Sequence, residues 1–237
     1  MGLFSKKKKS QSNLHMRGFP GHVDTCKCLY LGAEKGLQID FNMLDLAGNE
    51  QKADAYLSLS PFGKVPCLGE GDTIISGVAA ILPYIDIKGG GQTLVPRKAA
   101  KLGEQNYWIE VGQSVVLPHI NTLINEQVLK QMMNADHLPE QSKIDAALRA
   151  IDKVFDVVDK HLQNRDYFAM DYTFADVHWV PYIHFCEITG HEDLLNNRPN
   201  LKAWLERIKS RKNGAQLTYN VLPNLEQIKS KQLEQVA

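Results

Sequence analysis

The chain has 237 residues, of which 43% are hydrophobic and 23% are charged, and these values predict a soluble globular protein with one large domain or two small ones. Its 27 basic and 27 acidic side chains cancel, which argues against nucleic acid or an anionic membrane as a general partner. No stretch approaches the roughly 18 consecutive apolar residues of a membrane-spanning helix, so no transmembrane segment is expected.

Residues 1–13 are expected to form a disordered basic tail, because the run Lys6–Lys9 carries four like charges. The lysines follow only two large apolar residues, which is the reverse of the order in a secretory signal. Lys6 also stands where an N-myristoylation motif requires serine or threonine. The tail is therefore predicted to be solvated, and weak contact of its lysines with acidic lipid is the alternative.

Residues 14–86 alternate between strand-like and helix-like patterns in the order β-α-β-α-β-β-α, which is the order of a thioredoxin-like domain. The strand at 37–44 shows the alternation of apolar and polar side chains that is typical of a half-buried strand. Glu70–Asp72 marks a hairpin between the last two strands. The predicted strands lie at residues 14–18, 37–44, 63–68 and 73–75.

Two helices are predicted clearly in this domain. The first covers residues 25–35 and ends at Gly36, a favourable residue for a helix C-terminus. Ser76 would cap the second, which reaches about Ile85. Pro83 suggests a bend or early fraying within that helix.

The second half of the chain is predicted to be a separate helical domain. Residues 87–99 form the expected linker, since Ile87–Gln92 is rich in glycine, and residues 100–220 show only helical periods. The clearest stripe consists of apolar residues three or four positions apart: Ile144, Leu148, Ile151, Phe155, Val158 and Leu162.

Two helix starts are recognisable in this domain. Thr173–Asp176 is a capping box with aspartate as its fourth member, and Pro199 stands at the start of an amphipathic run. Residues 221–237 are polar and are expected to wrap the surface or to fray.

The four cysteines match neither a zinc ribbon nor a disulfide-stapled small domain. Reduced thiols in a cytoplasmic compartment are therefore expected. The eight histidines form no metal constellation, so no metal site is predicted. The cysteines are Cys26, Cys28, Cys67 and Cys186.

Taken together, four segments resemble the glutathione transferase superfamily, and the resemblance extends over nearly the whole chain. It implies an α+β fold with an N-terminal thioredoxin-like domain and an all-α C-terminal domain. It does not by itself establish an activity. The segments are Ala33–Leu37, Asp45–Lys52 with Tyr56–Pro66, Thr173–Val177, and Arg198–Arg207.

The resemblance implies a glutathione site at the edge of the sheet. A cis peptide bond between Val65 and Pro66 would present the main chain of Val65 to the cysteinyl unit of glutathione, as an exposed strand edge holds an extended peptide. Related proteins hold the glycine carboxylate with side chains at the positions of Gln51, Lys52 and Lys64. The alternative is that these three are plain surface residues.

The opposite rim departs from the family pattern. Relatives usually carry glutamate or glutamine followed by serine, which hold the γ-glutamyl group, at the positions of Gly77 and Val78. Neither residue offers a side-chain hydrogen bond. Ser76, one position earlier, or the N-terminus of the following helix would have to replace them.

Three residues are candidates for activating the thiol. The resemblance places His22 at the usual position, and the alternative is a solvated loop histidine. Thr25 is a second candidate and is also the predicted helix N-cap. Cys26 would have a lowered pKa if its thiol lay in the first turn of that helix.

A pocket for the second substrate is expected between the domains, and the first C-terminal helix would line it with Tyr107, Trp108 and Val111. Aromatic residues at helical spacing are also typical of a core. The leading hypothesis is a dimeric glutathione transferase-like enzyme acting on a small electrophile. The alternatives are a binding or regulatory protein of this fold without glutathione turnover, and an enzyme that uses the cleft for another ligand.

Overall fold

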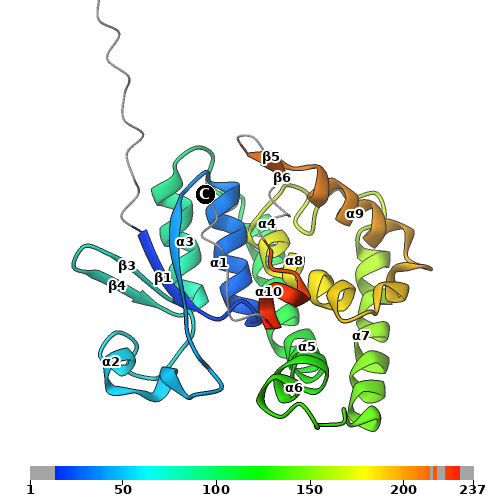
Figure 1. The fold of residues 1–237 in the computed structure, drawn as a ribbon. Helices are drawn as coiled ribbons and strands as arrows, with labels where there is room; N and C mark the ends of the chain where they lie inside the picture. Colours follow the sequence, from blue (N-terminus) through cyan, green and yellow to red (C-terminus); the bar gives the residue numbers. More distant parts are fainter. Residues whose placement is uncertain (1–13, 214–215, 218–221, 230–237) are drawn as a thin grey trace, which may run out of the picture.

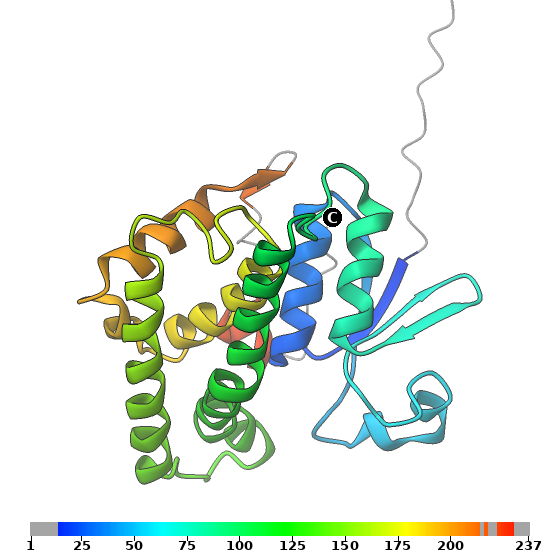
Figure 2. The same ribbon diagram turned by 180° about the vertical axis from the view of Figure 1, so that it is seen from behind.

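The computed structural model describes residues 14–213, 216–217 and 222–229 (Figure 1). It contains a sheet-bearing N-terminal domain beside a helical C-terminal domain, as the resemblance implies (Figures 1 and 2). The predicted basic tail, including Lys6–Lys9, lies outside the described residues. No described helix combines the length and the apolar character that crossing a bilayer requires.

The N-terminal domain is built on a four-stranded sheet with the strand order β2-β1-β3-β4. β1 pairs with β2 in parallel, and the other neighbours are antiparallel. Leu14 and Met16 are fully buried because alternate residues of β1 point into the core. The strands are β1 (Leu14–Gly18), β2 (Ile39–Met43), β3 (Cys67–Glu70) and β4 (Thr73–Ser76).

Two helices, α1 (Val23–Glu34) and α3 (Val78–Gly89), lie side by side against the sheet (Figure 1). The connection from β2 to β3 contains the short elements η1 (Glu50–Lys52) and α2 (Asp54–Leu57), which lie at the lower edge of the domain in Figure 1. The order of elements is the predicted one.

The helical domain begins with a nearly continuous helix from residue 99 to residue 133, which two turns of π-helix interrupt. The long α7 buries the predicted apolar stripe, of which Ile151, Phe155 and Val158 are fully buried. The elements are α4 (Ala99–Val111), η2 (Gly112–Val116), α5 (Leu117–Ile124), η3 (Asn125–Leu129), α6 (Lys130–Met133), α7 (Gln141–His161), α8 (Phe174–Ile188), η4 (Glu192–Leu195), α9 (Pro199–Ser210), β5 (Lys212–Asn213), β6 (Gln216–Leu217) and α10 (Leu225–Lys229).

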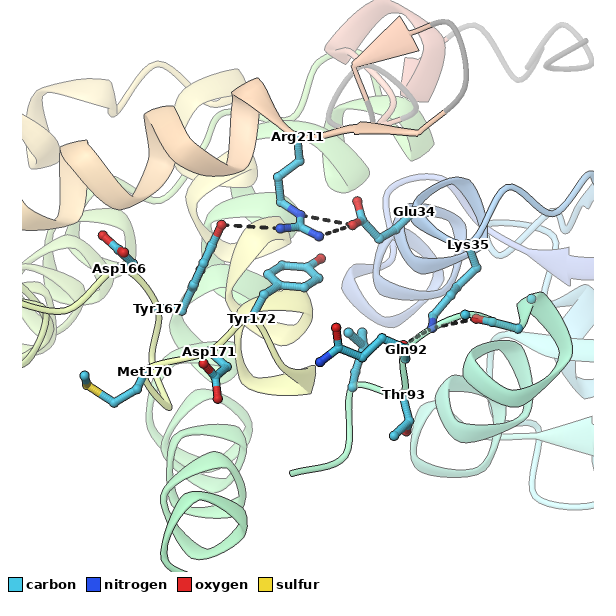
Figure 3. A pocket seen from close by; sticks show the side chains of 14 residues that line it. Glu34, Lys35, Gln92, Thr93, Asp166, Tyr167, Met170, Asp171, Tyr172 and Arg211 are labelled. Atoms are coloured by element: carbon cyan, nitrogen blue, oxygen red, sulfur yellow. Dashed lines mark hydrogen bonds and ion pairs between the residues drawn. The ribbon is translucent and has the colours of Figure 1, made fainter. Parts of the chain in front are cut away.

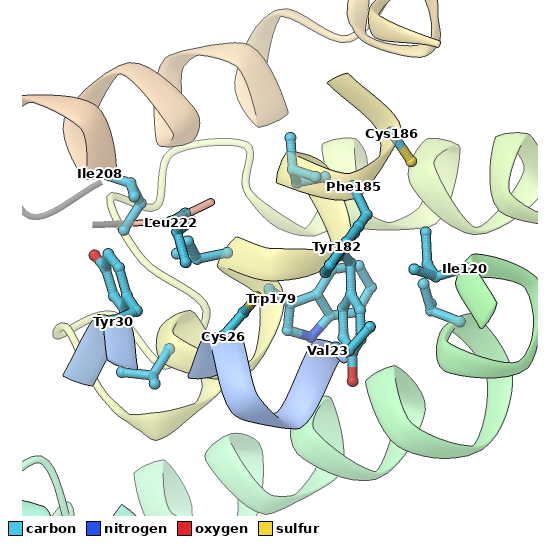
Figure 4. Close-up of a cluster of buried hydrophobic side chains, with 14 of the residues drawn as sticks. Val23, Cys26, Tyr30, Ile120, Trp179, Tyr182, Phe185, Cys186, Ile208 and Leu222 are labelled. Carbon is cyan, nitrogen blue, oxygen red and sulfur yellow. The ribbon is translucent and has the colours of Figure 1, made fainter. Parts of the chain in front are cut away.

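The central element of the molecule is α8, which is buried on nearly all sides and packs against α1 of the other domain. Figure 4 shows Val23 and Cys26 of α1 meeting Trp179 and Tyr182 of α8. The predicted capping box begins this helix, with the Asp176 carboxylate accepting the Thr173 N–H at 2.9 Å. The two domains therefore share one hydrophobic core.

Two predicted helix starts in the N-terminal domain were wrong. α1 begins at Val23 with His22 as its N-cap, so Thr25 lies inside the helix and does not cap it. α3 begins at Val78 with Gly77 as its N-cap, and Ser76 is the last residue of β4. The backbone at Gly77 has φ +90°, a conformation that favours glycine, and this sharp turn separates Ser76 from the helix.

α3 also extends past the predicted end near Ile85 to Gly89, so part of the predicted linker is helical. Pro83 is exposed, as is Ala79, whose carbonyl oxygen lacks its usual helical donor because proline has no N–H. Water can satisfy that carbonyl, and the buried Ile81 and Ile85 hold the helix against the core on both sides of the proline.

The polar C-terminal segment was predicted to wrap the surface or fray, and its described part instead packs into the core. Leu222 and Ile228 are buried, and α10 lies against the N-terminal domain. An added Cβ at Gly21 would come within 3.1 Å of Ile228, which shows how closely α10 approaches the β1–α1 loop. Leu225 also packs against the core, so apolar side chains spaced along the segment anchor it.

Candidate functional site

The start of α1 carries the first predicted site residue. His22 is half-buried, makes no capping hydrogen bond, and its Nδ1 atom is buried without a partner. Burial lowers the pKa of His22, and the charges of Lys27 and Lys64 lower it further against the opposing effect of Asp24. The imidazole is therefore neutral near pH 7. A neutral ring still has one N–H to donate.

The predicted cis peptide bond between Val65 and Pro66 is present and directly precedes β3. Two hydroxyl groups fix the loop before it, since Tyr56 donates to the Lys64 carbonyl oxygen at 2.7 Å and Ser60 donates to the same oxygen at 3.0 Å. The sheet edge is thus held in one conformation at the residues that would pair with a peptide.

The three predicted carboxylate-binding residues lie on adjacent segments. An added Cβ at Gly63 would lie 3.0 Å from the Gln51 carbonyl oxygen, so the chain at Gln51–Lys52 runs beside the chain at Gly63–Lys64. Both lysines are exposed. The side-chain oxygen of Gln51 is buried and has no hydrogen-bond partner. The described part of the chain thus brings two exposed lysines close to a glutamine whose side-chain oxygen has no donor.

The opposite side of the candidate site, at Gly77 and Val78, has no polar side chain, as the sequence predicts. The Gly77 N–H donates to the Pro66 carbonyl oxygen at 3.3 Å, which places this turn next to the cis-proline. An added Cβ at Gly77 would meet nothing within 4 Å, and Val78 is buried in the core. Ser76 does not replace the missing groups freely, since its hydroxyl lies 2.6 Å from that of Ser60.

The other two candidates for thiol activation are inside the protein. Thr25 is fully buried, and its side chain packs against Gly18 of β1. Cys26 is also fully buried, its thiol donates to the Pro20 carbonyl oxygen at 3.2 Å, and burial raises its pKa. The expected lowering of the Cys26 pKa was therefore wrong, because desolvation outweighs the helix dipole.

The three residues predicted to line the second pocket point in different directions. Trp108 is in the core, in ring contact with Phe168 and Trp179, whereas the Tyr107 side chain is 59% exposed. Val111 is half-buried and packs on the core. None of the three lines the cavities of about 660, 140 and 190 Å³ beside the described residues.

An apolar cavity of about 140 Å³ instead lies between the domains. Phe19, three residues before His22, lines it from the β1–α1 loop. The sequence offered one signal for it, a group of methionines, because flexible thioether side chains are common at apolar binding surfaces. The other side chains come from the end of β2 and the segment after it, and from η3 and α6 at the end of the helix that covers residues 99–133. They are Met43, Leu44, Asp45, Leu46, Ala47, Asn125, Leu129, Lys130, Met132 and Met133.

A larger cavity of about 660 Å³ lies at the other end of α1 (Figure 3). Several of its charged side chains have partners. Arg211 donates to Glu34 at 3.0 Å and stacks on Tyr172, and Lys35 pairs with Asp86 at 2.6 Å. The contact between Arg211 and Glu34 connects the two domains.

No group of three or more histidine, cysteine or acidic side chains among the described residues could hold a metal ion. All four cysteines are free and buried.

Comparison with known proteins agrees with the fold. The family descriptions of the glutathione S-transferase N-terminal and C-terminal domains match residues 12–87 and 118–212. Glutathione S-transferase F13 of Arabidopsis thaliana is 32% identical over 191 residues, which cover 78% of this chain and 84% of that protein. The tobacco (Nicotiana tabacum) glutathione S-transferase APIC is 28% identical and is covered to 93% of its length. The crystal structure of glutathione transferase F7 from Populus trichocarpa superposes with a TM-score of 0.75 at 28% identity, covering 88% of this chain and 97% of that one. The chain belongs to the glutathione S-transferase family.

Proposed function

We propose that the protein is a glutathione transferase that conjugates or exchanges glutathione on a small, apolar electrophile. The names of the relatives support this activity, and so does the position of an unsatisfied polar atom. Buried polar atoms without a partner are rare in folded proteins and call for an explanation. Here His22 Nδ1 is such an atom, and the family resemblance assigns His22 to the site.

Different residues would bind glutathione and the electrophile. The main chain of Val65 would pair with the cysteinyl unit, while the side-chain N–H of Gln51 and the ammonium groups of Lys52 and Lys64 would donate to the glycine carboxylate. The sulfur would then lie at the start of α1, where the helix N-terminus favours an anion. His22 would donate its N–H to the thiolate, and the cavity beside Phe19 would bind the electrophile that the thiolate attacks.

Replacement of His22 by alanine is expected to lower kcat/KM for a chlorodinitrobenzene-type acceptor by about 100-fold, the usual loss when one donor to a developing or stabilised anion is removed. His22→Asn, which keeps an N–H donor, should lose less. His15→Ala is the matched control, because His15 is an exposed histidine of the same domain that pairs with Asp40 at 2.9 Å.

Wild-type protein that gives a flat calorimetric titration with millimolar glutathione, and no turnover, would contradict the proposed activity. Full turnover by His22→Ala would contradict only the role of His22.

The proposal includes a homodimer. Phe62 is 89% exposed in the loop before the cis-proline, and the edge strand β4 exposes Ile74. An exposed aromatic side chain next to an unpaired strand edge is typical of an interface. The nearly continuous helix at residues 99–133 adds exposed Tyr107 and Val115.

The cytoplasmic location inferred from the reduced thiols stays a prediction.

Phe62→Ser is expected to weaken the dimer by at least about tenfold, since burial of one large aromatic side chain contributes roughly 1.5–3 kcal/mol. Sedimentation equilibrium measures the dissociation constant. Leu138→Ser is the control, because Leu138 is 85% exposed but lies in the loop between α6 and α7. An equal effect of both substitutions, or of neither, would exclude Phe62 from the interface.

A further inference from the structure

A buried lysine connects the helical domain to the start of α1. The Lys27 side chain is 0% exposed, and its ammonium group donates to Asp24 Oδ1 at 2.8 Å and to the Tyr182 hydroxyl at 3.0 Å. The same nitrogen lies 4.8 Å from the centroid of the Tyr182 ring. Taking an ammonium group out of water is costly even when it is paired, so an apolar residue would be the simpler choice at such a position.

Tyr182 has little freedom to move away from Lys27. It is fully buried on α8, and an added Cβ at Gly112 would come within 2.8 Å of its ring. Figure 4 shows Tyr182 among the side chains that join α8 to the first turns of α1. The position of the Lys27 ammonium is therefore set by the helical domain.

Asp24 is the link from Lys27 to the candidate site. It is the second residue of α1, two positions after the N-cap His22, and its side chain is only 20% exposed. A carboxylate here would repel an anion held at the same helix terminus unless a cation neutralised it. Lys27 is that cation: burial lowers the pKa of its ammonium group, and the charge and hydrogen bond of Asp24 oppose that lowering.

The ionisable groups around His22 are consistent with this arrangement. On α1, Asp24 raises the pKa of His22 and Lys27 lowers it, and Lys64 from the loop before the cis-proline lowers it as well. On α8, His178 is buried with its Nδ1 atom unpartnered, and burial together with the Lys27 charge lowers its pKa. His178 and Tyr182 are thus neutral. Among these groups of α1 and α8, Lys27 is the cation that pairs with Asp24.

We infer that Lys27, held by Tyr182, is a positioning residue for the reaction, which neutralises Asp24 so that a sulfur anion can form beside His22. This inference rests on the proposed function. It assigns to the domain interface an electrostatic role in addition to packing. The helical domain then acts on the reacting sulfur through Tyr182, Lys27 and Asp24 without contacting it.

The test uses two neutral replacements, Lys27→Met and Lys27→Gln, in the full-length protein. Each should raise the pKa of His22, followed by NMR of labelled histidine without any thiol, by about one unit. Each should also raise the pKa of bound glutathione, followed by thiolate absorbance, so that the thiolate fraction near neutral pH falls about tenfold. The glutamine variant keeps a hydrogen-bonding side chain and gives a second reading if the methionine variant folds poorly.

Adding Asp24→Asn to either variant is the matched control. It removes the uncompensated carboxylate and should return both pKa values toward those of the wild type, although the packing at position 27 is unchanged. A merely structural role for Lys27 predicts that neither single variant raises the pKa of His22, and that result would overturn the inference. Failure of glutathione to bind would refute the proposed function alone, because the His22 titration still decides the role of Lys27.

Discussion

Replacing Asp176 by alanine is expected to lower the free energy of unfolding by about 3–5 kcal/mol. The carboxylate is fully buried and accepts the Thr173 N–H at 2.9 Å, the Phe168 N–H at 3.2 Å and the Trp204 indole N–H at 2.9 Å. Removing it leaves three buried donors without an acceptor, each costing about 1–3 kcal/mol before the structure relaxes. Urea denaturation followed by circular dichroism measures the change.

Asp171→Ala is the control for this prediction, because Asp171 lies in the loop just before α8 and its side chain is 68% exposed. Asp171 pairs with Lys101 at the surface, and such a pair contributes roughly 0–1 kcal/mol. A loss below about 1 kcal/mol for Asp176→Ala would mean that α8 does not depend on its capping box.

The double substitution Gly77→Glu with Val78→Ser is expected to raise the affinity for glutathione by about 30- to 1000-fold. It would supply one charged and one neutral hydrogen bond to the γ-glutamyl group, worth about 2–4 kcal/mol together. The space is available, since an added Cβ at Gly77 meets nothing within 4 Å. Isothermal titration calorimetry measures the dissociation constant.

The same substitution should lower stability. Residue 77 has φ +90°, which costs a side-chain-bearing residue about 1–3 kcal/mol, and serine replaces a buried valine at position 78. Gly77→Ala is the matched control, because it adds the backbone strain without the carboxylate and should not improve binding. Micromolar binding by the wild type, unchanged in the double variant, would show that other groups already hold the γ-glutamyl end.

The confirmed sequence predictions are those that depend on local pattern. Alternation of apolar and polar side chains predicted β2, observed at Ile39–Met43. Helical periodicity predicted the buried stripe on α7, and residue types three positions apart predicted the capping box of α8. Each of these patterns is set by backbone geometry within one element. The cis bond before Pro66 came from the resemblance and not from any local rule.

In the candidate site, local sequence patterns did not predict which side chains are buried. By itself the sequence determined the order of strands and helices and the lack of a polar side chain at Gly77 and Val78. The fold family and the assignment of His22 and Gln51 to the site came from the resemblance, and that assignment stays a prediction. Only the tertiary structure decided that Cys26 is an inert buried thiol, that Trp108 belongs to the core, and that Lys27 is buried against Tyr182. The reason is that burial depends on which distant element packs against a side chain: α8 covers residues of α1 that lie some 150 positions earlier in the chain, and no local periodicity encodes that contact.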